Sequence, residues 1–129
     1  MEMNASLEKM EWKARFGAGE YMNAGSLALD EAERIAKEIE RRINKGWARE
    51  RKNREAAISI SFDNLRQQFL IRVEVVVWGN GRISDNELGN FTEEGKATAL
   101  ALLNEVLETL KLAKRMALIK QALEHQVEG

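Results

Sequence analysis

The chain contains no cysteine. It can therefore form no disulfide framework, no thiolate nucleophile and no zinc site built on sulfur. Histidine is almost as scarce, because the single example, His125, lies four residues from the C-terminal end, where helix fraying places an acid or base poorly. We interpret His125 as a solvated helix-end residue. The sequence predicts no catalytic residue, no metal site and no cofactor, so we do not expect an enzyme.

Long apolar runs are also missing. The longest, "VVVW" and "ALALL", are far shorter than the roughly 20 residues that a membrane-spanning helix needs, and no basic-then-apolar leader opens the chain. We therefore expect no membrane segment and a cytoplasmic location. With 129 residues, of which 44% are hydrophobic and 32% charged, residues 1–129 have the size and composition of one globular domain.

Three segments alternate apolar and polar residues, the period-2 pattern of strands with one buried face. They are residues 10–16 ("MEWKARF"), 56–62 ("AAISISF") and 69–78 ("FLIRVEVVVW"). A short helix capped by Ser6 is the alternative for residues 9–16. Pairing Phe62 with Phe69 brings both apolar sets to one side of a hairpin with its loop at 63–68. Asn80-Gly81 predicts a further short hairpin strand near residues 82–84.

Two segments repeat apolar residues at helical spacing. The first begins near Ser26 or Asp30, and Gly46 ends or loosens it. The glycine-rich residues 17–25 before it predict a loop or flexible connector. The second begins near Thr92 and runs to about residue 125. The predicted fold is α+β in the order βαββ(β)α, with an antiparallel sheet and both helices on one face. This order also occurs in RNA-contacting modules such as ribosome hibernation factors, which is a likeness of topology alone.

The long second helix carries two apolar stripes. The first follows Ala99, Leu103, Val106, Leu110, Ala113 and Ala117. The second, roughly 100° around the helix, consists of Leu112, Met116, Ile119 and Leu123. A thin sheet covers only one of them, so the second stripe predicts an interface with another chain, most simply a two-fold copy in a homodimer. The alternative is that the first helix or the N-terminal segment covers it.

Residues 41–54, "RRINKGWARERKNR", carry seven basic side chains and one acid in a chain of net charge −1. This excess predicts a patch for an anionic partner, nucleic acid or a nucleotide, in which cations contact phosphates and a tryptophan stacks on a base. The patch consists of Arg41, Arg42, Lys45, Trp47, Arg49, Lys52 and Arg54. The alternative is a basic helix end that its own dipole stabilises and water solvates.

A protein partner is the competing prediction. Val76 and Trp78 fall on the outer face of the third strand, which is more apolar than a freely solvated face. Together with the long helix, they suit a protein-interaction module such as an inhibitor, an adaptor or an assembly subunit. The sequence therefore predicts a small homo-oligomeric binding or regulatory protein, with the anionic partner and the protein partner as its two versions.

One loop resembles part of a known metal site. Residues 80–88, "NGRISDNEL", resemble the latter half of an EF-hand calcium loop, with Gly81 at the sharp turn and Glu87 at the bidentate position. The positions of the leading carboxylates hold Val76 and Trp78, which supply no side-chain oxygen. We therefore expect a hairpin turn rather than a calcium site.

Overall fold

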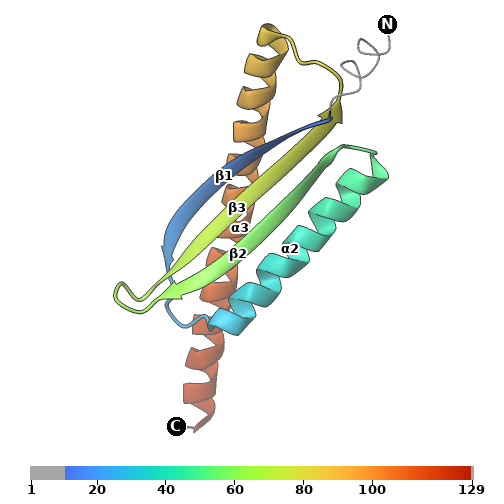
Figure 1. The fold of residues 1–129 in the computed structure, drawn as a ribbon. Coiled ribbons are helices and arrows are strands. Elements are labelled where there is room, and N and C mark those ends of the chain that lie inside the picture. The colour runs from blue at the N-terminus through green and yellow to red at the C-terminus, as the bar shows by residue number, and fades with distance from the viewer. Residues whose placement is uncertain (1–10, 129) are drawn as a thin grey trace, which may run out of the picture.

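The computed structural model describes residues 11–128, which form a three-stranded antiparallel sheet and two helices (Figure 1). The elements are β1 (Glu11–Asn23), α2 (Leu29–Arg49), β2 (Arg54–Asp63), β3 (Gln68–Asn80) and α3 (Asp85–Glu128). The strand order is β1-β3-β2, so β3 is central and β1 and β2 form the two edges. The predicted α+β class, the two helices and the long C-terminal helix are confirmed.

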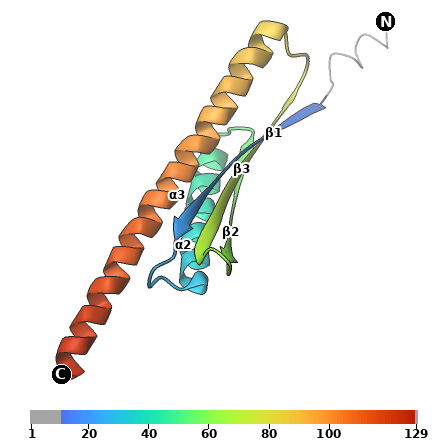
Figure 2. The ribbon, with the colours of Figure 1, turned by 90° about the vertical axis from the view of Figure 1, so that its left-hand side faces the viewer.

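The core lies between the sheet and the two helices. In β3, Phe69, Ile71, Val73 and Val75 point to the helices and are almost completely buried. The helices contribute Ala32, Ala36 and Ile39 from α2, and Ala99, Leu103, Val106 and Leu110 from α3. Because both helices pack on this face, the described elements leave the other face of the sheet uncovered (Figure 2).

Helix α3 is longer than the sheet that it packs on. Its 44 residues span about 66 Å, whereas the 13 residues of β1 span about 43 Å. Near its start, the ring of Phe91 contacts those of Trp12 and Phe16, with ring centroids 4.8 and 5.5 Å apart. Farther along, Lys114 Nζ donates to the carbonyl of Asn23 (3.1 Å). The C-terminal turns therefore extend past the sheet (Figures 1 and 2).

The strand predictions are largely confirmed, with one correction. Phe62 pairs with Phe69 as expected. Residues 11–16 are a strand, so the helix alternative is wrong there, whereas Ser6 and residues 9–10 lie outside the described residues. The connector predicted over 17–25 is wrong for most of its length, because β1 continues to Asn23 and pairs with β3 throughout. Backbone hydrogen bonds to β3 hold this stretch, whose glycines give no side-chain pattern.

The helix boundaries also differ from those predicted. No strand forms at residues 82–84, and α3 begins at Asp85 rather than Thr92. The reason is a capping box: the Ser84 N–H donates to Glu87 Oε2 (3.1 Å), and the Glu87 N–H donates to Ser84 Oγ (3.3 Å). Helix α2 passes through Gly46 and ends at Arg49.

Candidate functional site

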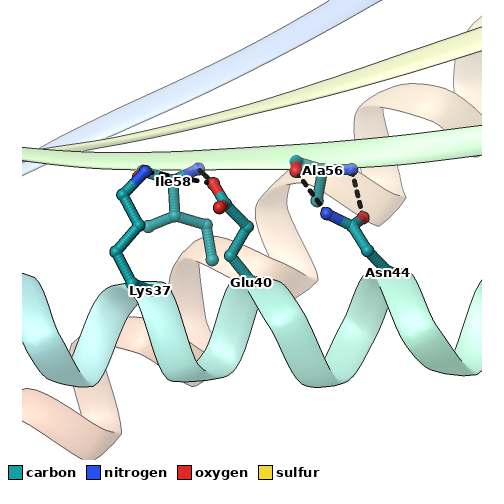
Figure 3. Close-up of polar contacts among 5 residues, drawn as sticks. All are labelled: Lys37, Glu40, Asn44, Ala56 and Ile58. Atoms are coloured by element: carbon teal, nitrogen blue, oxygen red, sulfur yellow. Dashed lines mark hydrogen bonds and ion pairs between the residues drawn. The ribbon is translucent and has the colours of Figure 1, made fainter.

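Side chains of α2 bond to the outer edge of β2 (Figure 3). Asn44 accepts from the Ala56 N–H (2.7 Å) and donates to the Ala56 carbonyl (2.9 Å). Glu40 accepts from the Ile58 N–H (2.8 Å), and Lys37 donates to the Ile58 carbonyl (3.2 Å). These groups occupy the backbone donors and acceptors of Ala56 and Ile58 that another strand would need, so α2 protects this edge of the sheet at those two residues.

The predicted basic patch is divided between a helix, a turn and a strand. Helix α2 ends at Arg49, residues 50–53 form a turn, and Arg54 begins β2, so Lys52 does not continue the helical side that carries Arg41. The sequence placed the end or loosening of the helix at Gly46, whereas the helix continues through Gly46 to Arg49. The seven basic residues therefore do not form one continuous row.

Four of the seven basic side chains of residues 41–54 pair with carboxylates of the chain itself. They are Arg41 with Glu38 (2.5 Å), Arg42 with Glu105, Lys52 with Glu50 (3.1 Å) and Arg54 with Glu94 (3.2 Å). The hydrogen bond from Arg41 lowers the pKa of the Glu38 carboxyl and raises the pKa of Arg41. Arg42 and Arg54 contact α3, so their charges connect elements of the fold.

Three basic residues remain for an external anion. Lys45, Arg49 and Arg51 make no ion pair with the described part of the chain, and all three are exposed. Lys45 and Arg49 lie one turn apart on the solvent side of α2, and Arg51 follows in the turn with φ of 57°. Trp47 is half-buried against the core, and the guanidinium of Arg54 lies 5.6 Å from its ring centroid. The ring is therefore not free to stack on a base at that position.

The second stripe of α3 is exposed. Leu112, Met116, Ile119 and Leu123 are between 55% and 62% accessible, while Leu110 in the first stripe is fully buried. Helix α2 does not cover these residues, so the alternative that the first helix covers them is wrong, whereas most of the N-terminal segment, residues 1–10, lies outside the described residues. Four large apolar side chains thus follow one side of a helix that extends past the sheet.

Val76 and Trp78 lie on the outer face of the sheet, as expected. Trp78 is 37% exposed, and its partner across β1 is Lys13. Val76 faces Arg15, which pairs with Glu74 at 2.7 Å. An open hollow of about 660 Å³ adjoins these side chains. Because α3 packs on the opposite face, the outer face and the α3 stripe are two separate surfaces rather than one.

Neither a metal centre nor a membrane helix is found in residues 11–128. No group of three or more histidine, aspartate or glutamate side chains in this range is placed to hold a metal ion. No helix of this range is long and apolar enough to cross a bilayer. No family model matches the chain, and comparison with curated proteins and with solved structures finds no significant match. The candidate sites therefore depend on the geometry of the chain alone.

Proposed function

We propose that this protein is a small non-enzymatic interaction module that self-associates through the second stripe of α3. The exposure of Leu112, Met116, Ile119 and Leu123 is the observation that supports it most directly. Contiguous apolar side chains of this size are seldom left in water and mark interaction surfaces. Their spacing of four, three and four residues is that of a helix-pairing seam.

A second copy of the chain is the partner that fits this spacing. The order four-three-four reads the same in both directions, so an antiparallel copy places Leu112 opposite Leu123 and Met116 opposite Ile119. The two-fold axis then lies between Met116 and Ile119. Met116, Ile119 and Leu123 follow Lys114, which bonds to the last residue of β1, so most of the stripe lies on the part of α3 that extends past the strands of residues 11–128.

Light scattering during size-exclusion chromatography tests this proposal over a range of protein concentrations. The double variant Met116→Lys/Ile119→Lys is expected to lower the average mass, because it places charges in an apolar seam. The matched control is Leu118→Lys, since Leu118 is an exposed leucine of the same helix that lies off the stripe. A monomeric wild type, or a double variant with the wild-type mass, contradicts the proposal.

Anion binding is a second candidate function, with a smaller site than the sequence predicted. Lys45, Arg49 and Arg51, which are exposed and make no ion pair within residues 11–128, support it. Contact with phosphates releases counterions, so binding weakens steeply as salt rises.

Fluorescence anisotropy with labelled single- and double-stranded RNA and DNA tests this candidate. The triple variant Lys45→Glu/Arg49→Glu/Arg51→Glu is expected to abolish a salt-sensitive binding signal. The control triple variant Arg82→Glu/Lys96→Glu/Arg115→Glu makes the same change in net charge elsewhere. Equal loss of binding in both would show a bulk charge effect, and no binding by the wild type at low salt would exclude the site.

A further inference from the structure

The two edges of the sheet are not equivalent. Ala56 and Ile58 of β2 direct their backbone groups to α2, so the intervening Ala57 and Ser59 bond to β3. The alternation then continues across the sheet. Odd-numbered residues of β3 bond to even-numbered residues of β1, as in the pair Val73 and Ala18. The odd-numbered residues of β1 therefore direct their N–H and C=O groups outward.

This outer edge of β1 is open in the described structure. At residues 13, 15, 17, 19 and 21, the outward backbone groups have no hydrogen-bond partner within residues 11–128. Among the described residues, an outward group of this edge is bonded only at Asn23, whose carbonyl accepts from the side chain of Lys114. Figure 2 faces this edge and shows β1 in front of β3, with neither helix passing over it. A long unprotected edge is a template for pairing with another strand.

We propose that β1 pairs antiparallel with β1 of a second copy, about a two-fold axis at Ala18, to form a continuous six-stranded sheet. This inference goes beyond the proposed function, because it uses residues that the α3 stripe does not contain. The two glycines of the strand are symmetric about Ala18, so Gly17 of each copy faces Gly19 of the other. No side chain then stands on the outer face at the centre of the seam.

The charges of β1 select the antiparallel direction. Lys13 and Arg15 lie in the first half of the strand, and the antiparallel register places them opposite Asn23 and Tyr21 of the other copy. Parallel pairing would instead place each cation beside its own copy, and like charges directly opposite one another destabilise a sheet. The charges of β1 therefore favour antiparallel over parallel pairing of two copies of the strand.

The helix side of the sheet has room for the second copy. Glu20 points to that side and is exposed, although its β3 partner Ile71 is fully buried. Glu20 is therefore uncovered near the edge, whereas Phe16 is buried with α3 packed against it, and Met22 farther along the strand is also buried. The antiparallel register about Ala18 places the buried Phe16 of one copy opposite the exposed Glu20 of the other, so a covered position meets an uncovered one at that pair.

Disulfide trapping tests the register, since the chain has no cysteine of its own. In the proposed pair, the two Ala18 residues face each other at a non-hydrogen-bonded position, with Cα atoms about 4.5 Å apart. This separation suits a disulfide. Ala18→Cys is introduced into the Met116→Lys/Ile119→Lys background, so that the α3 stripe does not hold the copies together. The control is Ser59→Cys in the same background, an exposed position on the outer face of the protected strand β2.

Mild oxidation at low micromolar concentration is expected to convert most of the Ala18→Cys protein to a covalent dimer on a non-reducing gel. Ser59→Cys is expected to stay monomeric there, although its thiol is more accessible. Absence of the Ala18→Cys dimer, or equal dimer yields from both proteins, overturns the proposal. Neither result depends on whether the stripe self-associates.

A second pair of variants applies if Ala18→Cys disturbs folding. A Cβ atom at Gly17 or Gly19 meets its nearest neighbour at 3.9 or 3.4 Å, so the monomer accommodates a side chain at both positions. Gly17→Lys/Gly19→Lys is expected to lower the mass of the assembly, measured by light scattering, to half or less with an unchanged circular dichroism spectrum, because four added charges meet in the seam. The control Ser59→Lys/Ser61→Lys is expected to keep the wild-type mass. A Gly17→Lys/Gly19→Lys protein with the wild-type mass overturns the proposal.

Discussion

At Gly95, α3 packs closely against Phe16 of β1. A Cβ atom at this position would lie 2.3–2.6 Å from three ring atoms of Phe16. That ring is buried and contacts Phe91 at its edge, so it has little room to move. The lack of a side chain at Gly95 therefore sets the distance between the helix and the sheet.

Gly95→Ala is predicted to destabilise the protein by about 1–3 kcal/mol, the usual cost of overpacking a core. This loss outweighs the roughly 1 kcal/mol that alanine gains over glycine in a helix. Urea unfolding followed by circular dichroism measures the change.

Gly89 supplies the control in the same helix. A Cβ atom there has no neighbour within 4 Å, so Gly89→Ala is predicted to stabilise the protein by roughly 0.5–1 kcal/mol through helix propensity alone. If both alanine variants stabilised the protein equally, the close contact between Gly95 and Phe16 would be wrong.

At the scale of elements, α2 and β2 are joined by polar bonds as well as apolar packing. Asn44→Ala is predicted to lose about 1–3 kcal/mol of stability, because it leaves the N–H and C=O of the buried Ala56 without partners. Hydrogen exchange of the Ala56 amide is predicted to accelerate in the same variant. Chemical unfolding and exchange measured by NMR check the two effects.

Glu38→Ala is the control for this prediction. Glu38 lies on the solvent side of the same helix and pairs with Arg41 at an exposed position, where such pairs contribute roughly 0–1 kcal/mol. Its loss is predicted to leave the exchange of Ala56 unchanged. Comparable exchange in both variants would show that general loosening of α2, rather than the Asn44 bonds, controls the edge.

The sequence predicted the elements whose side chains alternate or repeat regularly. The pattern of β2 and β3 was sufficient to place Phe62 opposite Phe69, and the first stripe of α3 is buried as its spacing indicated. The second half of β1 was missed because Gly17 and Gly19 carry no pattern, and its strand form depends on pairing with a segment some 50 residues away. The start of α3 had a local signal, the capping box from Ser84 to Glu87, which the Asn-Gly turn signal outweighed.

The candidate sites show the same division. Periodicity located the α3 stripe, because exposure of a helical residue follows from its angle around the helix. The ion pairs of Arg42 with Glu105 and of Arg54 with Glu94 join residues 63 and 40 positions apart. Composition could not reveal these pairs, so it overestimated the number of cations in the basic patch that are left for an external anion. The side chains that protect the edge of β2 were likewise invisible, because their role depends on where α2 lies along the strand.

At the scale of the whole molecule, the two proposed self-interfaces lie on different sides. Most of the α3 stripe lies where the helix extends past the sheet, and β1 is the edge of the sheet opposite to β2, the edge that α2 contacts. Each interface is two-fold and closes on itself. A protomer with two such surfaces forms a closed tetramer when the two axes intersect at right angles, a larger closed assembly when they intersect at an angle such as 60° or 45°, and an open chain when they do not intersect.

The mass of the assembly is therefore predicted to fall in steps. Wild-type protein, with a chain mass of 14.7 kDa, is expected to form tetramers or larger species. Met116→Lys/Ile119→Lys leaves dimers paired through β1, and Gly17→Lys/Gly19→Lys leaves dimers paired through α3. The variant that combines all four changes is monomeric, because both seams then carry like charges. Analytical ultracentrifugation resolves these species. If the wild type forms only dimers and only one of the two double variants is monomeric, the interface that this variant changes is the one that forms the dimer.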